Sequence, residues 1–108
     1  MIVCVSNLNQ GIGEWKDNAE RIKRAIRKAK TLQDPVLLLP ELATVGCGAG
    51  DLLLRYDTYA RSNEVLQEIL RETIGITVVC GTLLIYQGKL YNVAAVMRDG
   101  RILACPCR

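Results

Sequence analysis

The feature that most constrains the fold is an unbroken apolar run from Val36 to Leu39, which follows Pro35 and ends at Pro40 and Glu41. A strand whose residues are apolar at every position is typical of a sheet covered on both faces, because neither side of the strand then meets water. The run therefore predicts a buried strand with a carboxylate directly after its last residue.

The segments on either side of this run predict an α/β chain. Apolar residues at helical spacing indicate two helices, one capped by Asp17 or Asn18 and one over residues 63–73. Gln87-Gly88 and Asp99-Gly100 indicate turns between the last strands. Apolar runs indicate further strands over residues 2–8, 76–85, 90–97 and 102–105. The order begins as alternating α/β and ends as a meander, so we expect an α/β fold with a mixed sheet.

Length and charge limit the classes of protein to which the chain can belong. Its 108 residues suit one small domain or a piece of a larger one. A net charge of +3 is too small to indicate a nucleic-acid partner. The basic residues between Arg21 and Lys30 are best explained as the solvated face of a helix, with an anion-binding patch as the alternative. No apolar run reaches the about 20 residues that a membrane span needs, so we expect no membrane partner.

The five cysteines and the absence of histidine limit the possible chemistry. An odd count without an opening secretory segment favours reduced cysteines in a cytoplasm. Without histidine, the chain has no Ser-His-Asp or Cys-His pair of its own. Cys105 and Cys107 lack a second pair at zinc-finger spacing, so we expect no metal site.

Glu41 is the first candidate for a catalytic residue. A carboxylate at the carboxyl end of a buried strand lies where open α/β sheets place their ligands. Partial burial there would suit a general base. The alternative is a structural carboxylate, either in the first turn of a helix or satisfied by backbone N–H groups.

The glycine-rich segment over residues 44–51 is a second candidate. Glycine-rich loops between a strand and a helix bring backbone N–H groups close to a ligand. The segment alone is similar to the first motif of S-adenosylmethionine-dependent methyltransferases. Thr44 stands where that motif has an acidic residue, and residues 76–85 lack the expected ribose-binding carboxylate. A methyltransferase-like domain therefore remains an alternative with two mismatches.

Several collinear motifs cover nearly the whole chain: Leu8-Asn9-Gln10, Glu14-Trp15, Asn18, Leu39-Pro40-Glu41-Leu42, Gly46-Cys47-Gly48, Asp51-Leu52, Leu90-Tyr91-Asn92, Ala94-Ala95 and Asp99 to Leu103. Together these motifs resemble the carbon–nitrogen hydrolase (nitrilase) superfamily, and among its branches the glutaminase domain of glutamine-dependent NAD synthetases. The resemblance identifies residues 1–108 as the N-terminal portion of such a domain.

The resemblance implies a fold, a reaction and partners. The fold is a four-layer α-β-β-α sandwich. The reaction is hydrolysis of glutamine, or of another small amide, by a Glu-Lys-Cys triad in which Glu41 is the general base. A C-terminal synthetase domain would use ATP and the ammonia to amidate deamido-NAD, whereas this portion needs no cofactor. The complete protein is expected to be cytoplasmic and homo-oligomeric.

The chain departs from the family pattern at two members of the triad. Arg108 stands at the position of the lysine in an ungapped alignment and keeps its charge but not its shape. None of the cysteines matches the motif of the nucleophile, although Cys47, near Glu41 in sequence, is a conceivable surrogate. We therefore expect the chain alone not to hydrolyse glutamine and to expose an apolar sheet face. An amidase of another branch and a degenerate interaction module remain alternatives.

Overall fold

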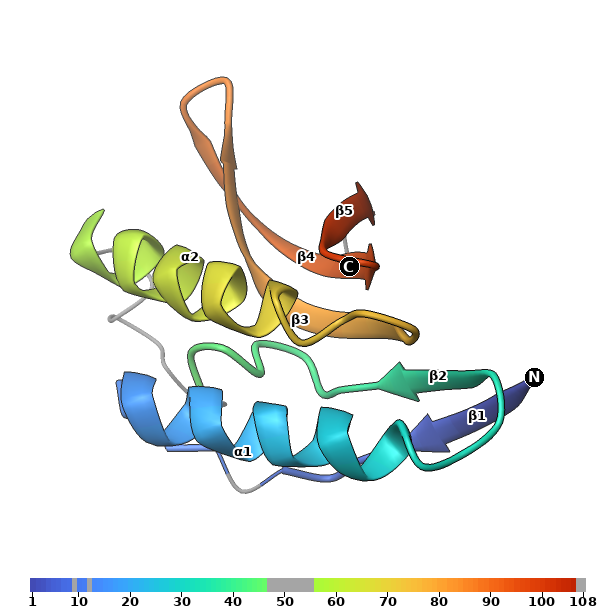
Figure 1. Ribbon diagram of the computed structural model, residues 1–108. Coiled ribbons are helices and arrows are strands. Elements are labelled where there is room, and N and C mark those ends of the chain that lie inside the picture. Colours follow the sequence, from blue (N-terminus) through green and yellow to red (C-terminus); the bar gives the residue numbers. More distant parts are fainter. Residues whose placement is uncertain (9, 12, 47–55, 107–108) are drawn as a thin grey trace.

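The computed structural model describes residues 1–8, 10, 11, 13–46 and 56–106, and Figure 1 shows their arrangement. The described part of the chain contains two helices and five strands in the predicted order. Their bounds are β1 (Ile2–Val5), α1 (Trp15–Ala29), β2 (Pro35–Leu38), α2 (Tyr56–Leu70), β3 (Thr77–Tyr86), β4 (Lys89–Arg98) and β5 (Arg101–Ala104).

The five strands form one mixed sheet in the order β1-β2-β3-β4-β5. Strands β1, β2 and β3 are parallel, and β4 and β5 continue the sheet in antiparallel pairing. The β3–β4 hairpin is the longest pairing, with ten residue pairs from Thr77↔Arg98 to Tyr86↔Lys89. The α/β architecture and the mixed sheet predicted from the sequence are confirmed.

Both helices contribute to one core on one face of the sheet. Figure 1 shows α1 and α2 running side by side, and they share a buried cluster with the strands. The helices contribute Ile22, Ile26 and Ile69, all fully buried, and β3 contributes Val78 and Cys80. Residues 78 and 80 share a face because side chains alternate along a strand. The core thus lies between the helix pair and that face.

The turns behave as their residues predict. Gln87-Gly88 and Asp99-Gly100 connect β3, β4 and β5, and all four residues have positive φ, between 50° and 77°. Positive φ at both central residues defines the tight turn whose twist matches that of a hairpin. The turn residues therefore account for the meander at the end of the chain.

Three boundary predictions were wrong. Helix α1 begins at Trp15, and its N-cap is Glu14 without a side-chain hydrogen bond, so neither Asp17 nor Asn18 caps it. Helix α2 begins at Tyr56 rather than at residue 63. The sequence prediction missed its first two turns because they are too polar to show apolar residues at helical spacing. Strand β1 is short and largely exposed, because it forms the edge of the sheet rather than its interior.

Ion pairs to α2 and to the turn that follows it account for part of the basic face of α1. Lys23 bonds Glu68, and Arg27 contacts Glu72 with Nη2 at 2.6 Å. The hydrogen bond to Glu68 raises the pKa of Lys23. These contacts favour a structural role for the face over an anion-binding patch. Neither described helix is long and apolar enough to cross a membrane.

Truncation of a core isoleucine tests the helix–sheet packing. Ile69 is fully buried, so Ile69→Ala is expected to lower the free energy of unfolding by about 2–5 kcal/mol through lost burial and a cavity. Ile74 is 60% exposed, so the matched variant Ile74→Ala should change it by less than about 0.5 kcal/mol. Urea titration followed by circular dichroism measures both, and equal effects would contradict the packing.

The exposed edge strand β1 is expected to promote self-association. Val3 and Val5 are 53% and 74% exposed, and Val5 also lines a cavity of about 280 Å³ beside the end of α1. Unpaired strand edges and apolar patches favour association. Sedimentation velocity should show concentration-dependent oligomers that Val3→Lys/Val5→Lys reduces and Ile74→Lys does not. A monodisperse monomer at high concentration would rule this out.

Candidate functional site

The candidate site is built on the segment from Pro40 to Gly46, called here the Glu41 turn. It follows β2 and lies against the middle of β3. Gly81 N–H donates to the Pro40 carbonyl at 3.2 Å, and Thr44 N–H donates to the Gly81 carbonyl at 3.3 Å. Within the turn, Gly46 N–H donates to the Leu42 carbonyl at 2.8 Å. The backbone after β2 is therefore fastened to one residue of β3 through both of its peptide groups.

Gly81 permits a contact that no other residue allows. A Cβ at this position would lie 2.4 Å from the Leu42 nitrogen, 2.5 Å from the Pro40 oxygen and 2.6 Å from the Glu41 Cα. These are backbone atoms, so they cannot rotate away. Leu42 also has φ of 52°, in the left-handed region that costs a non-glycine residue energy. Backbone in such a conformation next to Glu41 is typical of a functional site.

Three buried hydroxyl groups connect the Glu41 turn to α2 and β3. Thr44 Oγ1, Ser62 Oγ and Thr82 Oγ1 form a closed triangle with sides of 2.7, 3.0 and 2.9 Å. They belong to the turn, to α2 and to β3, and all three residues are at most 1% exposed. A hydroxyl donates one hydrogen bond and accepts others, so the triangle can satisfy each of its members. It ties three elements together at a point that water does not reach.

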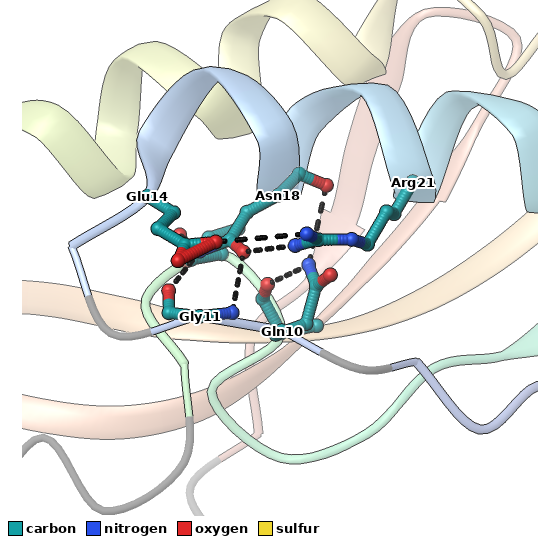
Figure 2. A network of polar contacts seen from close by, with 7 residues as sticks. Gln10, Gly11, Glu14, Asn18 and Arg21 are labelled. Carbon is teal, nitrogen blue, oxygen red and sulfur yellow. Dashed lines mark hydrogen bonds and ion pairs between the residues drawn. The ribbon is translucent and has the colours of Figure 1, made fainter.

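Side chains before and within α1 hold the turn from another side. Gln10 Nε2 donates to the Ala43 carbonyl at 2.5 Å, and Asn18 Nδ2 donates to the Thr44 carbonyl at 3.4 Å. Figure 2 shows how Asn18 also exchanges hydrogen bonds with the backbone of Gly11, at 2.9 and 3.0 Å. Asn18 is fully buried. It therefore links the segment before α1 to the Glu41 turn instead of capping the helix.

The outer part of this network is ionic. Arg21 Nη1 donates to Asn18 Oδ1 at 3.2 Å, and its Nη2 lies 3.6 Å from Glu14 Oε1, as Figure 2 shows. Arginine cannot lose its proton, so the acceptor side of the Asn18 amide is fixed toward it. The result is one orientation for Asn18 and, through it, for the turn.

Glu41 lies just past the carboxyl end of β2, as the sequence predicts, but its side chain is exposed rather than partly buried. It is also not in a helix, because residues 41–45 form a turn. Asn92 Nδ2, on β4, donates to Glu41 Oε1 at 2.5 Å. The carboxylate thus projects from the turn after β2 and accepts a hydrogen bond from a side chain 51 residues away in sequence.

The other candidate site residues are Arg108 and the cysteines. Arg108 and Cys47 lie outside the described residues. Cys80 is fully buried in the core and Cys4 packs against the same core, so both cysteines are structural. Burial raises the pKa of the Cys105 thiol, which disfavours the thiolate. The described residues contain no group of three side chains suited to a metal ion.

Sequence reasoning missed the residues that position Glu41. The buried hydroxyls and the role of Asn18 left no local pattern. Two signals were present: Gly81 interrupts an apolar strand, which often marks a close backbone approach, and Asn92 is a polar residue between Leu90 and Val93. Neither signal indicates that the residue contacts the segment around Glu41.

No family model matches the chain. Among curated relatives, it is 34% identical over 104 residues to the glutamine-dependent NAD(+) synthetase of Acinetobacter baylyi, covering 94% of this chain and 19% of that protein. It is 32% identical over 103 residues to the enzyme of the same name from Thermotoga maritima, covering 94% of this chain and 18% of that protein. The chain thus spans about a fifth of the length of these relatives.

Solved structures agree with the sequence matches. The glutamine-dependent NAD(+) synthetase from Cytophaga hutchinsonii superposes with a TM-score of 0.92 and 28% identity, covering 98% of this chain and 18% of that one. The structure from Acinetobacter baumannii, a complex with adenosine diphosphate, gives 0.91 and 28%, covering 98% and 20%.

The mixed sheet with two helices on one face, and the turn after β2, have the nitrilase-like fold of these neighbours. Within that class, the chain matches an N-terminal part of the glutamine-dependent NAD(+) synthetases in sequence and in structure. The resemblance stated from the motifs is confirmed, and the methyltransferase-like alternative is dropped.

Substitution of Gly81 tests the close contact between β3 and the Glu41 turn. Gly81→Ala places a Cβ among backbone atoms, so we expect the turn to shift and the free energy of unfolding to fall by about 1–3 kcal/mol. Trp15, the single tryptophan, packs against Val45 of the turn, so its fluorescence should change in the folded state.

The control for this variant is Gly88→Ala. Unlike Gly81, Gly88 has a positive φ of 77°, but an added Cβ there meets nothing within 4 Å. This substitution should cost only backbone strain, about 1 kcal/mol, and leave the Trp15 emission unchanged. Identical spectra for both variants would show that the turn does not depend on Gly81.

Proposed function

We propose that the chain is the first part of a glutaminase domain and that Glu41 is its general base. The observation that carries this proposal is the placement of Glu41 at the carboxyl end of β2, on a turn fastened to Gly81. Kinship with glutamine-dependent NAD(+) synthetases supports glutamine as the amide. A catalytic group on a rigid element keeps the geometry that proton transfer needs.

The proposed reaction uses Glu41 twice. The carboxylate accepts the proton of a cysteine thiol, and the thiolate attacks the amide carbon of glutamine. When the carbon–nitrogen bond breaks, Glu41 returns the proton to the leaving nitrogen, which departs as ammonia. Water, deprotonated by the same carboxylate, then attacks the thioester and releases glutamate and the thiol. The carboxylate ends the cycle as it began.

The rest of the triad is proposed to come from beyond the described residues. The resemblance implies that the nucleophilic cysteine belongs to the second half of the family's domain. Arg108 stands at the position of the lysine in an ungapped alignment, where a cation would hold the tetrahedral oxyanion. Arginine keeps the charge with a different donor geometry. Glu41 is therefore the one member of the triad that the described residues supply.

The proposed biological role is based on the full-length synthetases that the chain resembles. We propose that the ammonia passes to a C-terminal synthetase domain, which uses ATP to amidate deamido-NAD in the cytoplasm. This portion needs no cofactor of its own for the glutaminase step. A homo-oligomer is part of the same proposal, because association would cover the apolar residues of the exposed edge strand β1.

A chimera tests the role of Glu41. The purified chain should release no ammonia from glutamine. The Acinetobacter baylyi synthetase with its matched segment replaced by this chain should release it, and Glu41→Gln in the chimera should lower kcat about 10²–10⁴-fold, because glutamine cannot accept the proton. Ammonia is measured with a coupled glutamate dehydrogenase assay.

Glu64→Gln is the matched control. Glu64 lies on α2, is exposed and pairs only loosely with Arg61 at 3.6 Å, so the same chemical change there should leave kcat unaltered. Full activity of the Glu41→Gln chimera would refute the proposed base. Glu41-dependent ammonia release by the isolated chain would refute the need for a second segment.

A further inference from the structure

We propose that Asn92 is a positioning residue whose side-chain amide sets the orientation of the Glu41 carboxylate. This inference rests on the proposed function of Glu41 as the general base. Asn92 lies in the middle of β4, and its Nδ2 donates to Glu41 Oε1 at 2.5 Å. An amide N–H is a suitable donor for a carboxylate oxygen, and hydrogen bonds to an ionised acceptor are stronger than neutral ones.

The strand register explains how two residues so distant in sequence meet. Asn92 pairs with Leu83 in the β3–β4 hairpin, so their side chains share one face of the sheet. Gly81 lies on the same face, two residues before Leu83, because side chains alternate along a strand. The Glu41 turn crosses β3 at Gly81, where a Cβ would lie 2.6 Å from the Glu41 Cα. Asn92 is therefore within reach of the carboxylate.

The other end of the Asn92 amide shows that the contact is directional. Asn92 Oδ1 is buried and has no hydrogen-bond partner among the described residues. A buried unsatisfied acceptor is costly, and a purely structural asparagine normally satisfies both ends of its amide. The reversed orientation would bring Oδ1 against a carboxylate oxygen. The Asn92 amide thus donates to Glu41 through Nδ2, while its Oδ1 is left without a hydrogen bond among the described residues.

The backbone contacts and Asn92 have separate tasks. Gly81, the hydroxyl triangle and Gln10 fix the backbone of the Glu41 turn. These contacts act on the backbone and do not themselves set the side-chain torsions of Glu41, and ordering an exposed side chain opposes rotamer entropy. The Asn92 amide restricts those torsions. Its loss should lower kcat without weakening glutamine binding, because the orientation of a base affects proton transfer rather than ground-state contacts.

Asn92→Asp in the chimera is the sharpest test. The aspartate has nearly the shape of asparagine but faces Glu41 with an anion instead of a donor, so the carboxylate should turn away. We expect kcat for ammonia release to fall about 10–100-fold with KM changed less than about threefold. Asn92→Ala, which removes the donor without adding charge, should lower kcat in the same way.

Arg98→Ala is the control on the same strand. Arg98 Nη1 donates to Thr77 Oγ1 at 2.9 Å, so this variant also removes a side-chain bond between β4 and β3, but six residues from Asn92. It should leave kcat and KM unchanged. Unaltered kcat in both folded Asn92 variants, or a rise in KM alone, would overturn the positioning role.

A measurement on the isolated chain separates this inference from the proposed function. In ¹⁵N-labelled protein, the Asn92 side-chain amide signals should move in Glu41→Gln, whereas the Gln10 amide, which donates to backbone carbonyls, should not. Unmoved Asn92 signals would overturn the contact itself. A chimera without Glu41-dependent activity, together with moved Asn92 signals, would instead refute the glutaminase proposal.

Discussion

The close approach of the Glu41 turn to Gly81 is the contact on which the site depends. Three backbone atoms of the turn occupy the space where any other residue at position 81 would carry its Cβ. Both peptide groups of Gly81 bond the turn at the same place. A backbone-to-backbone contact of this kind cannot relax by a change of rotamer. The position of the Glu41 Cα is thus determined by β3, although the residue follows β2.

Buried and partly buried polar contacts surround the place where the Glu41 turn meets Gly81. The hydroxyl triangle of Thr44, Ser62 and Thr82 joins the turn to α2 and β3. Asn18 and Gln10 join it to α1 and to the segment before it. Buried polar groups stabilise a structure only when their partners are in place, because each unsatisfied one costs about 1–3 kcal/mol. Such a network specifies one arrangement of the turn more sharply than apolar packing alone would.

The comparisons and the structure together show which structural features lie in the part of the synthetases that this chain matches. The chain covers about a fifth of its curated relatives, and its solved neighbours superpose over 98% of it. Within this fifth lie a complete helix–sheet core and one oriented carboxylate. Glu41 and most residues of β1 are exposed. The segment therefore combines a packed scaffold with surfaces suited to further protein contacts.

The sequence by itself determined the order of the elements, the mixed sheet, both hairpin turns and the place of Glu41 at the end of β2. These features depend on periodicity and turn chemistry, which involve residues a few positions apart. Only the tertiary structure decided that β1 is an exposed edge, that Asn18 is a buried link rather than a cap, and that Asn92 faces Glu41 across 51 residues. Contacts of this second kind arise when separate strands and helices pack together, and local sequence patterns carry no information about which distant partner a polar side chain will meet.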